Sequence, residues 1–274
     1  MRDERDNDMT FCLGMKSRFG LVAIADTRLT SGSEISFAKK IQTYRGESHG
    51  MFIMASGLRS VRDKALTYFD ERLASAETAL PHLYLVANAL AEEIRRVRAE
   101  DEQWLAKSGL SFDLHVILGG QMANDQACRM FLIYPDGTWI EVTEDTPYAL
   151  IGESSYGKPT LDRAWRFDAS LEDALTIGLL AFDATQASTD DVGPPLDTVL
   201  RRDGNPAMHE HRFSAEDLAP LSVRWSEWLA RGITDAESVS ASLFAVLEAA
   251  VLQPDTLRGG KTRGSDRRPK GPRA

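Results

Sequence analysis

The segment from Met9 to Asp26 constrains the fold more than any other part of the sequence. After Thr10, large apolar residues alternate with small or polar ones, a turn follows at residues 17–20, and an apolar run leads into Asp26. This pattern predicts two antiparallel strands joined by a tight turn. A hairpin of this length returns Asp26 to the side of Thr10, so the first two strands are expected to bring a hydroxyl and a carboxylate together.

Thr10 follows a methionine, and removal of Met9 would give this threonine a free α-amine in addition to its hydroxyl. A threonine hydroxyl is a weak nucleophile until a base accepts its proton, and a terminal amine is one such base. An α-amine titrates at about 7.7–8.0, so it can accept a proton near neutral pH and later return it. A Met-Thr pair alone also fits the start of an edge strand, so the nucleophile hypothesis depends on the neighbouring residues.

The residues after Asp26 supply further groups of the kind that such a nucleophile needs. A third strand is expected to carry Lys39 and Lys40, and a fourth strand begins after a turn at residues 45–47 and ends at Gly57. The chain therefore presents a threonine, an aspartate, a lysine and a glycine in that order.

In these residues the sequence resembles the proteasome-type β subunits of the N-terminal-nucleophile hydrolases, which use an N-terminal threonine with an aspartate, a lysine and a backbone oxyanion hole. Asp26 lies sixteen residues after Thr10, as in that family. Lys40 matches the family's lysine, but the interval from the aspartate is shorter here, so Lys39 remains an alternative. Gly57 matches the glycine whose N–H lines the oxyanion hole.

A later segment, residues 151–163, resembles the bacterial proteasome-like proteins called Anbu and the β-proteobacterial proteasome homologues. With the run at 192–197, the resemblance extends to about residue 205. The sequence departs from the parent pattern at Glu153, where proteasomes carry a supporting serine. The resemblance also implies supporting residues, whose register within 188–191 stays open; the candidates are Arg28, Ser154, Ser188 and Asp191.

The remaining periodicity predicts an α+β protein. Helices are expected at residues 58–73, 81–106, 156–165, 171–186, 215–230 and 235–252, and strands at 114–120, 128–134, 138–142, 147–152, 196–202 and 208–213. Two blocks of strands, each followed by a pair of helices, imply two stacked antiparallel sheets covered on both outer sides by helices. This is the four-layer αββα sandwich of the N-terminal-nucleophile hydrolases. The charged face of the helix at 81–106 is expected to be solvated or to face another subunit.

Composition suggests one globular domain, which the resemblance implies is a peptidase domain at residues 10–252, and the two ends of the chain differ from it. Residues 1–8 are almost wholly charged, which suits a propeptide at 1–9 or a start codon upstream of the true initiator Met9. Residues 253–274 carry seven Lys/Arg against two Asp, so this basic tail is +5 and the remainder of the chain is −14. The tail is expected to be disordered. An acidic body argues against nucleic acid as the principal partner.

No apolar run approaches the roughly 18 residues that span a bilayer, and the N-terminus lacks the apolar core of a signal peptide. A cytoplasmic location without a membrane partner is therefore expected. Cys12 and Cys128 are expected to be reduced core thiols. His209 and His211 share one face of a strand, but with no third ligand nearby they are expected to be an exposed pair, and we expect no metal or organic cofactor.

The resemblance implies a threonine-type endopeptidase that acts on peptides or unfolded proteins inside a homo-oligomeric ring. In that mechanism Thr10 attacks, Lys40 lowers the pKa of its hydroxyl, Asp26 holds Lys40, and Gly57 binds the oxyanion. Two alternatives stay open. One is an amidase of the same chemistry that acts on a small molecule, and the other is a ring-forming scaffold without activity.

Overall fold

The computed structural model describes residues 10–31, 34–47, 49–75 and 80–251. The described residues divide into two units, one that ends at Ser222 and one that begins at Val223. The predicted propeptide at 1–9 and the predicted basic tail at 253–274 lie outside the described residues. The predicted limits of the peptidase domain, residues 10 and 252, adjoin these segments and stay a prediction.

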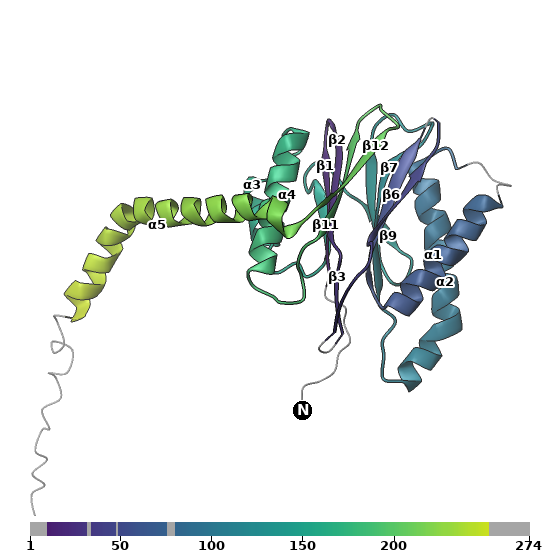
Figure 1. Ribbon diagram of the computed structural model, residues 1–274, viewed down its shortest axis with the longest axis horizontal. Coiled ribbons are helices and arrows are strands. Elements are labelled where there is room, and N and C mark those ends of the chain that lie inside the picture. Colours follow the sequence, from purple (N-terminus) through teal and green to yellow (C-terminus); the bar gives the residue numbers. More distant parts are fainter. Residues whose placement is uncertain (1–9, 32–33, 48, 76–79, 252–274) are drawn as a thin grey trace, which may run out of the picture. The chain divides into compact units, whose positions relative to one another are not determined.

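Two five-stranded antiparallel sheets form the centre of the first unit (Figure 1). The first sheet has the order β10-β1-β2-β11-β12, with β1 (Phe11–Ser17), β2 (Gly20–Asp26), β10 (Tyr148–Gly152), β11 (Leu196–Arg202) and β12 (Met208–Phe213). The second has the order β5-β6-β7-β8-β9, with β5 (Ile41–Arg45), β6 (Gly50–Gly57), β7 (Leu114–Gln121), β8 (Arg129–Ile133) and β9 (Trp139–Glu141). A separate hairpin joins β3 (Arg28–Ser31) to β4 (Glu34–Phe37).

Two pairs of helices cover the outer faces of the sheets (Figure 1). The second sheet packs against α1 (Arg59–Ala74) and α2 (Leu83–Lys107), and the first sheet packs against α3 (Lys158–Ala164) and α4 (Leu171–Gln186). The predicted four-layer αββα sandwich of the α+β class is therefore confirmed.

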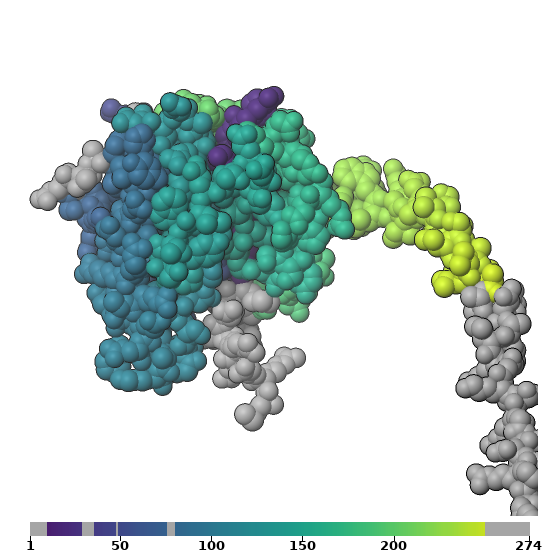
Figure 2. Space-filling model, turned by 180° about the vertical axis from the view of Figure 1, so that it is seen from behind, coloured from purple at the N-terminus to yellow at the C-terminus, as the bar shows by residue number. Residues whose placement is uncertain are grey.

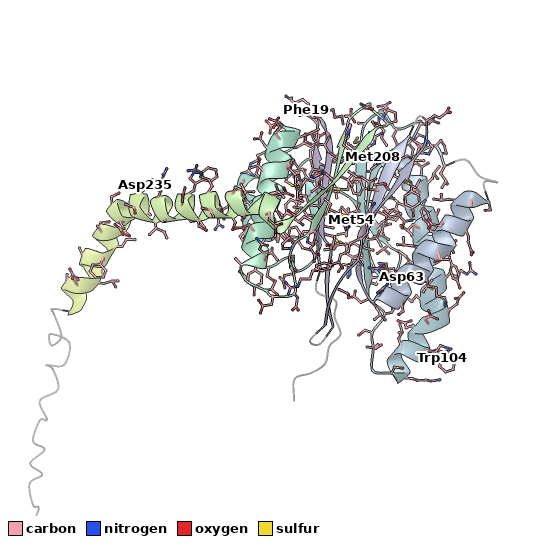
Figure 3. The ribbon with its side chains drawn as sticks, in the orientation of Figure 1. Phe19, Met54, Asp63, Trp104, Met208 and Asp235 are labelled. Atoms are coloured by element: carbon pink, nitrogen blue, oxygen red, sulfur yellow. The ribbon has the colours of Figure 1, made fainter. Side chains whose placement is uncertain are left out.

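The innermost layer of apolar side chains lies between the two sheets. Figure 3 shows Met54 of β6 and Met208 of β12 in this layer, which also contains Phe52 and Met130. Every residue of β2 is buried, and Figure 2 shows little of the purple surface of the first hairpin on that face of the unit. A sheet that is buried on both faces explains the continuous apolar run of β2, which the sequence shows before Asp26.

Most predicted elements are confirmed to within a few residues at their ends, with two differences. The helices expected at 215–230 and 235–252 form one continuous helix, α5 (Ala215–Val251), which runs through Gly232 without a break. Lys40 lies in the connection between β4 and β5 rather than in a strand. Within the described residues, no helix is both long and apolar enough to cross a membrane.

Side chains on the charged face of α2 form ion pairs with α1 of the same chain. Lys64 of α1 contacts Glu100 and Asp101 of α2 at 2.7 and 2.8 Å, and Arg72 of α1 contacts Glu92 of α2 at 2.5 Å. These ion pairs join α1 to α2 at the surface of the unit. A neighbouring subunit is therefore not needed to neutralise this face, although the sequence left that interpretation open.

Candidate active site

The hairpin of β1 and β2 places Asp26 beside Thr10, as the sequence predicts. Cys12 pairs with Ala25 across the two strands, so the residues just beyond this pair meet at the same end of the sheet. The Thr10 hydroxyl donates a hydrogen bond to Oδ1 of Asp26 at 3.0 Å, and the backbone N–H of Phe11 donates to the same oxygen at 2.8 Å. Both Thr10 and Asp26 are buried.

Lys40 completes this cluster. Its Nζ donates to Oδ1 of Asp26 at 2.8 Å and to the carbonyl oxygen of Arg28 at 2.8 Å. The Lys40 and Asp26 side chains are 1% and 0% exposed, whereas Lys39 is 52% exposed and pairs with Glu210 of β12. The structure therefore brings Lys40, and not Lys39, to Asp26.

Burial and hydrogen bonding act on the Asp26 carboxyl in opposite directions. Burial raises its pKa, while the Lys40 ammonium and the hydrogen bonds from Lys40, Phe11 and Thr10 act to lower it. Oδ1 accepts all three hydrogen bonds, and the buried Oδ2 has no partner among the described atoms. The oxygen of Asp26 that contacts the hydroxyl of Thr10 thus also contacts the ammonium of Lys40.

Two glycines shape the surroundings of Thr10. Gly152 has φ +83°, and a Cβ at this position would overlap the carbonyl oxygen of Thr10. Gly57 has φ +126°, and a Cβ there would overlap the carbonyl oxygen of Asp113. Both positions lie in the region of φ that favours glycine, and the close backbone approach excludes a side chain. Both glycines line one pocket, and Gly152 abuts the Thr10 backbone, so Gly57, the expected oxyanion donor, borders a pocket next to Thr10.

The contacts of the four supporting candidates involve residues other than Thr10. The Arg28 guanidinium lies beside Gly193, and its buried Nε has no hydrogen-bond partner among the described residues; it is the Arg28 carbonyl that contacts Lys40. The Ser154 carbonyl accepts the N–H of Lys158 ahead of α3. Ser188 is exposed, and its hydroxyl donates to Ala184 at the end of α4; Asp191 donates its N–H to Thr189. The support that these side chains were expected to give Thr10 therefore stays a prediction.

Cys12 lies next to Thr10, whereas the sequence predicts only that it is a core thiol. Its Sγ is 3.8 Å from the Thr10 hydroxyl oxygen, because residues two apart on a strand share a face. This alternation is the signal in the sequence that identifies Cys12 as a neighbour of the site. Burial raises the pKa of the Cys12 thiol to about 12, so it is protonated at neutral pH.

The other predicted thiol and the histidine pair lie away from this cluster. Cys128 is buried near Arg201, and burial raises the pKa of its thiol to about 12 as well. His209 and His211 are exposed on β12, at the edge of the first sheet, as predicted. In the part of the chain that the structure describes, no three His, Cys, Asp or Glu side chains are grouped as metal ligands would be.

The sequence and the fold of this chain are similar to those of known proteins. The proteasome subunit family matches residues 9–194, which is more than half of the chain. The chain belongs to the proteasome subunit family. A curated relative, proteasome subunit beta 1 of Pyrobaculum arsenaticum, is 22% identical over 199 residues, which cover 72% of this chain and 92% of the relative.

Solved structures of Anbu proteins are also similar to this member of the proteasome subunit family. The Gly-1 mutant of Anbu from Hyphomicrobium sp. strain MC1 is 34% identical with a TM-score of 0.76, covering 83% of this chain and 99% of that one. The helical assembly of the Anbu complex from Pseudomonas aeruginosa contains a chain that is 29% identical with a TM-score of 0.77, covering 82% of this chain and 96% of that one. The resemblance to Anbu proteins that residues 151–163 suggest is confirmed.

The buried ion pair predicts a pH-dependent cost for the loss of Lys40. In Lys40→Ala, Asp26 stays buried without its cation, so we expect the free energy of unfolding at pH 7 to fall by about 3–5 kcal/mol. Burial raises the folded-state pKa of Asp26 above the unfolded value of about 3.9, so this cost shrinks as the pH falls toward that value and both states become protonated. Urea denaturation at pH 7 and pH 4.5 measures both effects.

Lys39→Ala is the matched control for this experiment. It removes an exposed ion pair, so we expect a loss of about 1 kcal/mol or less at either pH. A larger loss in Lys39→Ala than in Lys40→Ala, or a Lys40→Ala deficit that grows toward acid pH, would contradict the assignment of the buried pair.

Proposed function

We propose that this chain is a threonine-type endopeptidase whose nucleophile is Thr10, exposed as the N-terminal residue when residues 1–9 are removed. The observation that carries the proposal is the buried contact of the Thr10 hydroxyl with Asp26, whose Oδ1 also binds the Lys40 ammonium. Membership of the proteasome subunit family supports hydrolysis of peptide bonds.

The proposed first step is attack by the Thr10 hydroxyl on the carbonyl carbon of the substrate. The free α-amine of Thr10 accepts the hydroxyl proton as a new C–O bond forms. Lys40 places a positive charge close to Oγ1 through their shared contact with Asp26, and this charge stabilises the negative charge that develops on the oxygen. Asp26 balances the charge of Lys40 in an environment that excludes water, so the ammonium stays in one position.

The proposed second half of the cycle releases the two products. The N–H of Gly57 donates to the carbonyl oxygen as it becomes an oxyanion, an interaction worth about 2.7–4 kcal/mol where such donors are removed from other enzymes. The protonated α-amine gives its proton to the leaving nitrogen, and the C–N bond breaks to leave an ester on Thr10. Water then attacks this ester, again with the amine as base, and restores the hydroxyl.

Substitution of the nucleophile tests this function directly. In Thr10→Ala we expect hydrolysis of a fluorogenic peptide to fall by a factor on the order of 10³ or more, since no hydroxyl remains to attack. Thr10→Ser retains a hydroxyl and an α-amine, so it should keep measurable activity. Thr27→Ser, which removes a buried methyl group and keeps the hydroxyl that donates to the Pro195 carbonyl, is the control and should stay within a few-fold of the unsubstituted chain.

Several outcomes would contradict the proposal. Full peptide hydrolysis in Thr10→Ala would exclude Thr10 as the nucleophile. Hydrolysis of simple amides without cleavage of any peptide would instead support the small-molecule amidase. Absence of both activities in a protein that begins at Thr10 would favour the inactive scaffold.

We further propose that the chain assembles with copies of itself, since the similar Anbu complex of Pseudomonas aeruginosa forms a helical assembly. In the unit that begins at residue 223, α5 exposes large apolar side chains that a water-facing helix does not need. Val239, Leu243, Val246 and Leu247 are all at least 64% exposed. Burial of such side chains against another protein chain stabilises an assembly. Closure into a ring around a chamber, as the family resemblance implies, is part of this proposal.

Light scattering tests the assembly at micromolar concentration. We expect particles several times heavier than the 30.3 kDa chain. The double substitution Leu243→Glu with Leu247→Glu should lower the particle mass, because charged side chains oppose burial of this helix, whereas the neighbouring Ser242→Glu should not. A monomer in the unsubstituted protein would count against self-assembly.

A further inference from the structure

A pocket of about 440 Å³ lies beside Thr10, between the ends of the two sheets. Gly57 and Gly152 line it, and Gly152 abuts the Thr10 carbonyl oxygen. Glu153, the next lining residue, donates its N–H to that same carbonyl at 2.7 Å. This hydrogen bond and the close approach of Gly152 place the pocket next to the Thr10 backbone.

The charged groups of this pocket are acidic. Asp113, just before β7, accepts the N–H of Leu58 with its carbonyl oxygen at 2.9 Å, which places it next to Gly57. Its carboxylate is 3.1 Å from Nδ1 of His115, and both of these side chains are 38% exposed. Glu153 contributes a second carboxylate. None of the described residues that line the pocket is lysine or arginine, so Asp113 and Glu153 give it an acidic side.

The remaining wall of the pocket is apolar. Leu132 of β8 and Leu150 and Ile151 of β10 line it, and the Tyr134 ring packs edge-on against His115. An apolar wall with carboxylates at one side matches a side chain that has an aliphatic stem and a positive head. Lysine and arginine have this form, and they bury the stem while the head stays near water or an anion. An acidic side chain would be repelled here. A small apolar one would not reach the Asp113 and Glu153 carboxylates, which contact His115 and the Ser155 N–H within the chain.

We propose that this pocket binds the lysine or arginine side chain of a substrate residue next to the bond that is cleaved, with Asp113 and Glu153 as the residues that determine specificity. Charge-assisted hydrogen bonds from the ammonium or guanidinium to the two carboxylates supply the selection. The inference rests on the proposed function, because it makes this pocket a part of the substrate-binding site.

Peptide binding to the full-length Thr10→Ala variant tests the pocket separately from catalysis. Three fluorescent peptides that differ only in one central residue, Lys, Ala or Glu, are compared by anisotropy. We expect the Lys peptide to bind about 10-fold or more tightly than the Glu peptide. Adding Asp113→Asn with Glu153→Gln should remove most of this difference. The control Glu172→Gln, an exposed carboxylate on α4, should leave it unchanged.

The possible results distinguish a failure of the pocket assignment from a failure of the proposed peptidase function. Equal binding of the three peptides, or a Lys preference that survives loss of both carboxylates in a variant with an unchanged melting curve, would overturn the pocket assignment. If the double variant does not fold, the comparison of the three peptides on Thr10→Ala alone still decides. A Lys preference in binding without hydrolysis of any peptide by the mature protein would contradict the peptidase and leave the pocket assignment standing.

Discussion

The buried oxygen Oδ1 of Asp26 accepts hydrogen bonds from three donors: the Thr10 hydroxyl, the backbone N–H of the next residue, Phe11, and the Lys40 ammonium. A carboxylate loses much of its hydration on burial, so it is stable here only because a cation and N–H and O–H donors replace the water. The same contacts determine where Thr10 lies and which way its hydroxyl points. The geometry of the site therefore depends on the stability of this one ion pair.

The two sheets supply the dry environment in which that ion pair is strong. β1 and β2 lie in a sheet that is covered by helices on one side and by the second sheet on the other, so charges at their ends interact through protein more than through water. The connection from β4 to β5 delivers Lys40 from outside this sheet. Its neighbour Lys39 is directed to Glu210 at the surface. Two adjacent lysines thus serve different purposes, one in the buried cluster and one in an exposed contact between the edges of the sheets.

The sequence predicts those parts of the structure that follow from local pattern. The hairpin from Thr10 to Asp26 and the helix at 171–186 are found where the alternation and the helical periodicity indicate. Local pattern does not decide between Lys39 and Lys40, because the choice depends on the path of a short connection between two sheets. It also does not predict that one helix continues through Gly232, since a single glycine costs only about 1 kcal/mol in a helix.

The pocket beside Thr10 illustrates what cannot be read from sequence alone. Asp113 and Glu153 are forty residues apart and adjoin different sheets, and no spacing rule connects them. Only the packing of the two sheets, in which β10 contacts β6 and β7, brings their segments to the same place. Residue identity did give one signal, since Glu153 stands where the parent family carries serine. The other carboxylate of the pocket, Asp113, can be identified only from the structure.

The central claim is that the α-amine of Thr10 is the base, and the intact mass of the active protein tests it most directly. An amide nitrogen cannot accept the hydroxyl proton, so every active molecule must begin at Thr10. Mass spectrometry of the fraction that hydrolyses peptide should therefore show a chain without residues 1–9. An active fraction in which these residues are still attached to Thr10 would contradict the account.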